Sequence, residues 1–289
     1  MLSVENLYVK SLDIELLSNI NFNVAKSTAC GIIGESGSGK TLLVKTILNN
    51  NNLKTNGNIC YDNKIISKNI FGYIPQNPAL ALDPLYTIGQ QILELSKSKN
   101  KAEIVDICKE VNLDKKYLNY YPHQLSGGIK QRVLIAMALI NNPKIIIADE
   151  PTTSLDVTVQ LDILNLIKKI QKKHGLMLLF ISHDIKVIKY ICSDVIVMYG
   201  GRIVEKGQID VLEKPLHPYT KALVESVPKG KYNDCVVKGL LGNPIKLKEN
   251  ITGCNFYNRC VYKKDACKSH NKNNNIDGRI VNCILYNEV

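Results

Sequence analysis

Short apolar or alternating runs occupy much of the first 75 positions of the chain. Side chains alternate between the two faces of a strand, so runs of this kind, separated by turn-forming residues, predict strands. One stretch, residues 41–48, instead places its apolar side chains at helical spacing. The predicted strands cover residues 2–9, 14–24, 29–34, 56–62 and 69–75.

The pattern becomes helical from residue 77 to about residue 142, and strands return after it. Residues 144–149 and 176–182 are continuous apolar runs, which is typical of parallel strands buried on both faces. A helical pattern over residues 157–173 lies between them, and residues 194–207 predict a hairpin that turns at a glycine pair. Strands that alternate with helices predict an α/β core, here with a helical insertion.

The composition changes near residue 212. Residues 214–289 hold 13 Lys and Arg against 6 Asp and Glu, and so contribute most of the formal charge of +11. We therefore expect one domain over residues 1–212, with a helical subdomain at about 77–142, and a C-terminal appendage over residues 213–289. The basic excess predicts an anionic partner: a phosphorylated ligand, a nucleic acid or an acidic membrane surface.

The sequence lacks the patterns of secretion and of membrane spanning. No run approaches the ~20 apolar residues that cross a bilayer, and the first ten residues lack the basic and apolar regions of a signal peptide. We expect a cytosolic chain, whose cysteines are thiols or metal ligands rather than disulfides. Its basic tail has no aromatic residues interleaved with arginine, so we expect no nucleic-acid partner.

The motif that carries most chemistry is GESGSGKT, at residues 34–41, between a predicted strand and a predicted helix. Its glycines let successive backbone N–H groups point at one anion, and the helix start adds its dipole. In such a phosphate-binding loop the lysine reaches the β- and γ-phosphates of ATP, and the last hydroxyl binds Mg²⁺. The alternative, a chance glycine-rich turn, is disfavoured by the strand–loop–helix context. The expected ATP-binding residues are Gly34, Glu35, Ser36, Gly37, Ser38, Gly39, Lys40 and Thr41.

A second motif ends the predicted strand at residues 144–149, where Asp149 and Glu150 follow an apolar run. Two carboxylates at the end of a buried strand are costly unless a cation is bound there. Asp149 would then hold Mg²⁺, and Glu150 would polarise the water that attacks the γ-phosphate. A pair of acidic residues at a helix start is the alternative. Because the phosphate-binding loop is present, we favour the catalytic interpretation.

Between these motifs stands LSGG, which includes Ser126, Gly127 and Gly128. On its own it is explained by a loop followed by a helix N-cap. In this order and spacing, however, residues 2–212 resemble an ATP-binding-cassette (ABC) ATPase. The resemblance implies a P-loop NTPase fold: an α/β ABC-type nucleotide-binding domain with a helical insertion, here followed by a small Cys-rich C-terminal appendage.

The resemblance also implies roles for single residues. Gln76 in YIPQNP matches the family's Q-loop, which contacts Mg²⁺ at the catalytic site and communicates with a membrane partner. Asp156 in TSLD matches the D-loop, and His183 in FISHD matches the histidine that contacts the γ-phosphate. Two cassettes would pair head to tail, with ATP between one phosphate-binding loop and the other cassette's LSGG. The Ser126 hydroxyl and the following N–H groups fit this second anion-binding surface.

The kind of cassette follows from what surrounds these motifs. About 100 residues separate the two nucleotide motifs, too few for the long coiled coils of DNA-repair cassettes, and the chain holds one cassette without a fused membrane domain. Residues 217–228 (HPYTKALVESVP) and 253–260 (GCNFYNRC) closely resemble the C-terminal region of the nickel/peptide importer subfamily.

The tail also collects Cys254, Cys260, Cys267 and Cys283. Four thiolates in one small appendage suit a soft metal centre, and both Zn²⁺ and an iron–sulfur cluster accept four cysteines. The resemblance to the subfamily favours a [4Fe–4S] cluster, and the absence of paired C-x2-C spacings also disfavours zinc. Four free thiols are the remaining alternative.

These observations predict the ATP-binding and ATP-hydrolysing subunit of a binding-protein-dependent importer, at the cytoplasmic face of the cell membrane as a peripheral protein. Its partners would be a second ABC ATPase subunit (a paralogue or a second copy), two transmembrane permease subunits and an extracytoplasmic substrate-binding protein. The expected cargo is di- and oligopeptides, with nickel as the alternative. A nucleic-acid-associated ATPase and a redox sensor are the other function classes to be tested.

Overall fold

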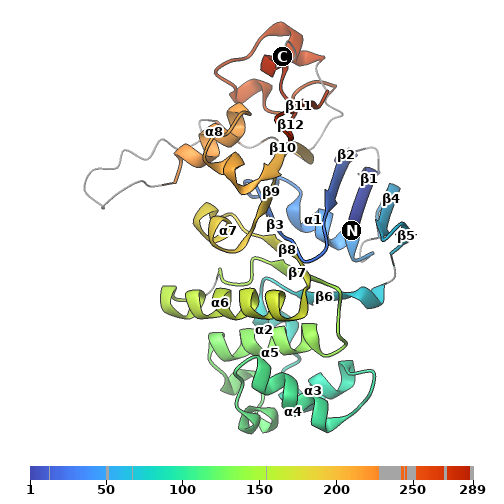
Figure 1. The fold of residues 1–289 in the computed structure, drawn as a ribbon, viewed down its shortest axis with the longest axis vertical. Coiled ribbons are helices and arrows are strands. Elements are labelled where there is room, and N and C mark those ends of the chain that lie inside the picture. The colour runs from blue at the N-terminus through green and yellow to red at the C-terminus, as the bar shows by residue number, and fades with distance from the viewer. Residues whose placement is uncertain are drawn as a thin grey trace, which may run out of the picture. The chain divides into compact units, whose positions relative to one another are not determined.

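The structure is a computed structural model (Figure 1) that describes residues 1–12, 14–49, 52–66, 68–153, 155–227, 242–243, 245, 252–269 and 272–286. Pro228, the last residue of the 217–228 motif, lies outside the described residues. The chain divides into two units, Met1–Ile66 with Ile181–Val289, and Ser67–Phe180. We describe each unit by itself.

The first unit contains an antiparallel sheet in the order β2-β1-β4-β5. In β1 the buried side chains stand at alternate positions, Leu2 and Val4, and then at Leu7 and Val9. The alternation changes phase because the register shifts between Val4 and Leu7, which is a β-bulge. The strands are β1 (Leu2–Ser11), β2 (Ile14–Val24), β4 (Lys54–Tyr61) and β5 (Lys64–Ile65).

A second sheet of the same unit has the order β11-β12-β10-β9-β3. β3 runs parallel to β9, and β9 and β10 form the predicted hairpin, in which Tyr199 pairs with Arg202. Each residue of β3 is buried, as the continuous apolar run predicts. The elements are β3 (Ala29–Ile33), α1 (Lys40–Ile47), α7 (Ile185–Ile191), β9 (Asp194–Tyr199), β10 (Arg202–Gln208), α8 (Pro218–Glu225), β11 (Asn274–Ile276) and β12 (Arg279–Val281).

The second unit joins the strand order β8-β7-β6 to a group of helices, which Figure 1 draws in green and yellow-green. β6 and β7 are parallel, and every residue of β7 is buried. Helix α5 packs against β6 and α6, as well as against the shorter helices α2, α3 and α4. The elements are β6 (Phe71–Ile74), α2 (Pro78–Ala81), α3 (Ile88–Leu95), α4 (Lys101–Glu110), α5 (Gly127–Leu139), β7 (Ile145–Asp149), α6 (Val157–His174) and β8 (Met177–Ile181).

Short 3₁₀ turns connect these elements at Lys68–Ile70, Lys115–Asn119, Pro122–Gln124, Ile209–Leu212, Tyr257–Arg259, Asp265–Lys268 and Ile284–Tyr286. The predicted strands, the helix at residues 41–48, the helical region and the hairpin are all present. Strands β5, β11 and β12 were not predicted from the sequence. No helix among the described residues combines the length and the apolar composition that crossing a membrane requires.

Candidate nucleotide site

The first unit carries the glycine-rich loop, which joins buried strand β3 to the start of helix α1. Gly34 has a φ of +154°, and a Cβ there would lie 2.2 Å from the Met198 carbonyl oxygen. Gly39, the N-cap of α1, has a φ of +102°, in the region that favours glycine. No side chain caps the helix start, and the backbone N–H groups of a helix start are suited to binding an anion. The exposed Thr41 is in the first turn.

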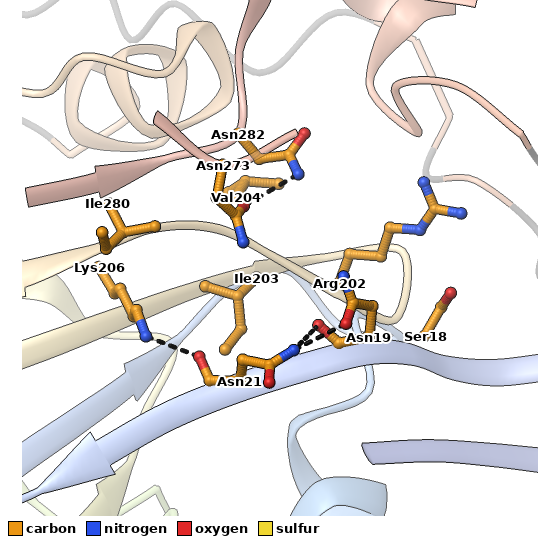
Figure 2. A pocket seen from close by; sticks show the side chains of 10 residues that line it. All are labelled: Ser18, Asn19, Asn21, Arg202, Ile203, Val204, Lys206, Asn273, Ile280 and Asn282. Carbon is orange, nitrogen blue, oxygen red and sulfur yellow. Dashed lines mark hydrogen bonds between the residues drawn. The ribbon is translucent and has the colours of Figure 1, made fainter. Parts of the chain in front are cut away.

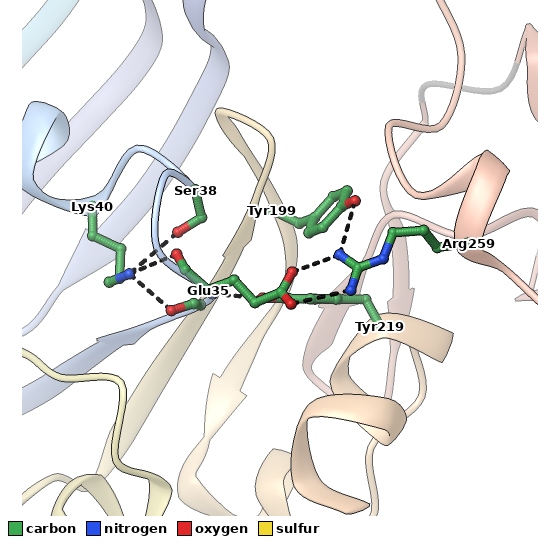
Figure 3. A network of polar contacts seen from close by, with 7 residues as sticks. Glu35, Ser38, Lys40, Tyr199, Tyr219 and Arg259 are labelled. Carbon is green, nitrogen blue, oxygen red and sulfur yellow. Dashed lines mark hydrogen bonds and ion pairs between the residues drawn. The ribbon is translucent and has the colours of Figure 1, made fainter. Parts of the chain in front are cut away.

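Lys40 is almost fully buried, with 7% of its surface exposed. Its ammonium donates hydrogen bonds to the carbonyl oxygens of Gly34 (2.8 Å) and Glu35 (2.9 Å), and to Ser38 Oγ (3.4 Å). These contacts draw the lysine back across its own loop (Figure 3). A buried positive charge is thereby held where the motif predicts the phosphates of ATP.

Glu35 is the loop residue with contacts to the most distant parts of the chain (Figure 3). Its backbone N–H donates to the Tyr219 hydroxyl at 2.8 Å. Its carboxylate accepts two hydrogen bonds from the Arg259 guanidinium, at 2.6 and 3.1 Å. Tyr219 is the second residue of α8, and Arg259 directly precedes Cys260, so both belong to the C-terminal segment that follows residue 212. The C-terminal segment is therefore in contact with the glycine-rich loop, which no sequence motif indicated.

His183 also belongs to the first unit. It is exposed, and it lies between the end of β8 and the start of α7. The next residue, Asp184, caps α7 by accepting a hydrogen bond from the Lys186 N–H at 2.8 Å. The Asp184 N–H in turn donates to Ser182 Oγ. Hydrogen bonds therefore stabilise the turn through the residues directly before and after His183.

In the second unit, three of the predicted residues lie at the ends of β6 and β7: Gln76, Asp149 and Glu150. Gln76 Nε2 donates to the Glu150 carboxylate at 3.1 Å, and Thr153 Oγ1 donates to the same oxygen at 3.1 Å. Glu150 has a φ of +46°, an uncommon backbone conformation for a residue with a side chain. Asp149 is buried. The burial of Tyr73, together with the negative charge of Asp149, raises the pKa of Tyr73 to about 12.

The LSGG segment forms the start of α5. Ser126 is the N-cap residue, yet its side chain makes no cap hydrogen bond, and both Ser126 and Gly127 are exposed. A Cβ on Gly128 would lie 2.7 Å from Val159 Cγ1 of α6. By contrast, Asp156 caps α6, since its carboxylate accepts a hydrogen bond from the Val159 N–H at 3.0 Å. The structure thus gives Asp156 a local structural contact, in addition to any role in a nucleotide site.

An apolar surface follows Gln76 along the chain. Leu80 is 86% exposed and Leu85 is 78% exposed, and Tyr86 is also exposed. These side chains come from α2 and the loop before α3. Single exposed apolar side chains are common on protein surfaces, whereas several that form one patch are typical of a surface that contacts another protein.

The four predicted cysteine ligands all line one small pocket in the first unit, together with His217, Pro218 and Phe256. Burial raises the pKa of Cys254 to about 11 and also raises the pKa values of the Cys260 and Cys283 thiols. Among the described residues, however, no three His, Cys, Asp or Glu side chains form a group that could hold a metal ion. The structure therefore gathers the thiols without forming a single-ion site.

A polar pocket lies where the C-terminal hairpin meets strands β2 and β10 (Figure 2). Lys206 Nζ donates to the Asn21 carbonyl oxygen at 2.7 Å, and burial lowers the pKa of Lys206. The Asn282 N–H donates to the Val204 carbonyl oxygen at 2.9 Å, and Asn282 Nδ2 donates to Asn273 Oδ1. These contacts attach the end of the chain to the first unit.

Comparison with known proteins matches two regions of the chain to families. Residues 17–153 match the ABC transporter family. Residues 204–267 match the oligopeptide/dipeptide transporter C-terminal region. The first region contains both nucleotide motifs, and the second contains Tyr219, Arg259 and three of the four tail cysteines.

The relatives and solved structures agree with this division. The chain is 35% identical over 319 residues to the dipeptide transport ATP-binding protein DppD of Bacillus subtilis, covering 100% of this chain and 95% of the relative. It is 35% identical over 314 residues to the oligopeptide transport ATP-binding protein OppD of Haemophilus influenzae, covering 99% and 97%. Among structures, it resembles the dimeric ATP-binding cassette MJ0796 bound to ADP and Pi, with a TM-score of 0.64, 27% identity, and coverage of 72% of this chain and 99% of that one. The chain belongs to the ABC transporter ATP-binding proteins, in the branch that carries the oligopeptide/dipeptide transporter C-terminal region.

Proposed function

We propose that this chain couples ATP hydrolysis to the uptake of di- and oligopeptides, as a peripheral subunit at the cytoplasmic face of a membrane. The observation that carries the proposal is the presence of both regions, the cassette and the oligopeptide/dipeptide C-terminal region, over nearly the whole length of relatives that are named for dipeptide and oligopeptide transport. The ATPase would occupy residues 1–212 and the appendage residues 213–289.

In this proposal the glycine-rich loop holds the phosphates of ATP. Lys40 would exchange its contacts with loop carbonyls for the β- and γ-phosphates, and the exposed Thr41 would bind Mg²⁺. Asp149 and Gln76 would complete the Mg²⁺ site. Glu150, held by Gln76 and Thr153, would orient the attacking water and accept its proton.

A second copy or a related cassette would complete the site. The start of α5 supports this, since the exposed Ser126 side chain makes no cap hydrogen bond and the helix start is suited to an anion. Ser126, Gly127 and Gly128 would contact the partner cassette's ATP, with Asp156 at the same interface and His183 at the γ-phosphate. The similarity to a dimeric cassette bound to ADP and Pi supports the arrangement.

Two transmembrane permease subunits would bind the second unit. Gln76 connects to Glu150 on one side, and the exposed apolar surface of Leu80, Leu85 and Tyr86 follows it on the other. A permease segment that covers these side chains could therefore affect the catalytic carboxylate through Gln76. An extracytoplasmic binding protein would deliver the peptide to the permease.

The four tail cysteines would hold a [4Fe–4S] cluster as thiolates. The support for this part of the proposal is that all four line one pocket and that four cysteine thiolates are the usual ligands of such a cluster. Such a cluster supplies an electron-accepting, structure-stabilising centre when bound. Iron and acid-labile sulfide in anaerobically purified protein, lost in Cys260→Ser, would support this assignment; their absence after reconstitution would contradict it.

The proposed function is tested with Glu150→Gln. Because the amide cannot accept the proton of the attacking water, we expect turnover to fall by about 10²–10⁴-fold while MgATP still binds. In the source cells, the variant should abolish uptake of a labelled dipeptide and leave uptake of radioactive nickel unchanged. Loss of nickel uptake alone would contradict the peptide assignment, and undiminished hydrolysis would contradict the role of Glu150.

A further inference from the structure

The starting observation is that Glu35, inside the glycine-rich loop, is held at three of its polar groups. Its N–H donates to Tyr219, its carbonyl oxygen accepts from Lys40, and its carboxylate accepts two hydrogen bonds from Arg259. Two of these three partners come from the C-terminal segment, 184 and 224 residues away in the sequence. The segment therefore contacts Glu35 both through a neutral hydrogen bond and through an ion pair.

The choice of arginine at position 259 is itself informative. The sequence has four arginines, Arg132, Arg202, Arg259 and Arg279, against 37 basic residues in total. A lysine presents a point charge, whereas the planar guanidinium pairs with both oxygens of a carboxylate. In a chain that uses lysine almost everywhere, the arginine at this position provides the two-point contact with Glu35.

The contact is partly buried, and aromatic rings pack against its arginine. The Arg259 side chain is 6% exposed and the Glu35 side chain 21% exposed. Arg259 lies over the rings of Tyr199 and Phe256, and it also donates to the Tyr199 hydroxyl. Phe256 in turn packs against Tyr199 and Tyr219. The guanidinium therefore has contacts both in its plane, to Glu35 and the Tyr199 hydroxyl, and with the two aromatic rings.

The backbone supports the same connection. Asn255 Nδ2 donates to the Gly200 carbonyl oxygen at 2.6 Å, and Arg202 Nη1 donates to the Gly253 carbonyl oxygen at 2.8 Å. Gly201, in the same β9–β10 turn, donates its N–H to the Ser38 carbonyl oxygen at 3.0 Å. The C-terminal segment thus contacts the β9–β10 turn, and that turn contacts the loop.

We propose that Arg259 is a positioning residue for nucleotide binding, which acts by pairing the Glu35 carboxylate and so cancelling a negative charge beside the bound phosphates. The proposal rests on the proposed nucleotide site at residues 34–41. A free carboxylate on this loop would repel the anionic polyphosphate, and the repulsion is strong where water is partly excluded. The C-terminal segment would then set ATP affinity without touching ATP.

The test is the affinity for MgATP of the full-length chain, measured by calorimetry in a Glu150→Gln background that prevents hydrolysis. Arg259→Gln should weaken binding by about tenfold, because Glu35 keeps its charge and loses its partner. Glu35→Gln should bind at least as tightly as the parent. The double variant, Arg259→Gln with Glu35→Gln, should return to within about threefold of the parent, because no charge is left to repel the phosphates.

Arg279→Gln is the matched control. Arg279 is also an arginine of the C-terminal segment, and it pairs with Asp210 and the Lys214 carbonyl oxygen, so its loss removes a second, more exposed ion pair away from the loop. We expect its MgATP affinity to equal that of the parent.

Two results would overturn the proposal: an unchanged affinity in Arg259→Gln, or a double variant that binds as weakly as Arg259→Gln alone. The second would mean that Arg259 only supports the fold of the segment. If Arg259→Gln does not fold, Arg259→Lys, which keeps the charge, should bind MgATP more tightly than Arg259→Met, and equal affinities would reject the charge argument. Lys40→Ala separates the role of Arg259 from the proposed nucleotide site. If Lys40→Ala does not weaken MgATP binding, the nucleotide site itself is rejected.

Discussion

Two helix starts in this molecule offer backbone N–H groups to an anion, and they are built in opposite ways. At α1 the buried Lys40 fills the loop, and contacts from Tyr219 and Arg259 hold its neighbour Glu35. At α5 the N-cap residue Ser126 is exposed and its side chain makes no cap hydrogen bond. One start is enclosed by its own chain, and the other is open.

The difference indicates what each start needs in order to work. The α1 loop carries its own positive charge and its own supports, so we expect a single chain to bind the phosphates there. The α5 start has no lysine or arginine in its first two residues, and its groups face outward. A helix start of this kind contributes when another molecule brings the anion to it, which agrees with a site completed by a second cassette.

Replacing Lys40 should have the largest effect of the variants compared here, a loss of MgATP affinity. Lys40→Ala removes the buried ammonium, and a hydrogen bond to a charged group is worth about 1.5–3 kcal/mol, so MgATP affinity should fall about 10- to 100-fold. Ser126→Ala is the comparison variant, and calorimetry on the single chain should find its affinity unchanged. Equal losses in the two variants would remove the distinction between the enclosed and the open start.

Filling the space at the α5 start should have a smaller, structural effect. A side chain at Gly128 would collide with Val159 Cγ1, since even a Cβ there would lie 2.7 Å away. Gly128→Val should therefore lower the free energy of unfolding by about 1–3 kcal/mol in urea denaturation. Gly127→Ala, whose Cβ would lie 3.3 Å from the flexible end of Leu155, should change it by less than about 0.5 kcal/mol. A tolerated valine would show that the start of α5 moves freely relative to α6.

The smallest expected change is in the free energy of unfolding, when the N-cap residues Asp156 and Ser126 are each replaced by alanine. Asp156 caps α6 with a 3.0 Å hydrogen bond, so Asp156→Ala should cost about 1 kcal/mol of unfolding free energy. Ser126 makes no such bond, and Ser126→Ala should stay within about 0.5 kcal/mol of the parent while it slows turnover. A cost for Ser126→Ala as large as for Asp156→Ala would mean that the serine serves its own helix rather than a partner.

The sequence was sufficient to predict elements in which neighbours along the chain decide the structure. The continuous apolar run of β7 is buried throughout, and GESGSGKT folds as the expected loop before α1. Gln76 and Glu150, connected by a hydrogen bond, were both predicted as site residues. Their roles in catalysis, like those of Asp156 and His183, stay predictions.

The missed features depend on contacts between distant residues. Arg259 was present in the analysed motif GCNFYNRC, yet nothing in its spacing pointed to Glu35, 224 residues earlier. Strands β11 and β12 have three residues each, Asn-Asn-Ile and Arg-Ile-Val, and three residues are too few to show alternation. They form because β10 offers unpaired backbone groups, which is a property of the folded sheet and not of the local sequence.

The C-terminal hairpin has one more consequence, for self-association. β12 pairs with β10 at Glu205 and Lys206, and β11 then becomes the outer strand, three residues long and largely polar. A long uncovered strand is a template for pairing with another chain, whereas a short polar strand is a poor one. The hairpin thus covers the middle of the seven-residue strand β10, and a chain cut before residue 272 would leave Glu205 and Lys206 without these partners and would be more prone to aggregate even if its nucleotide site were intact.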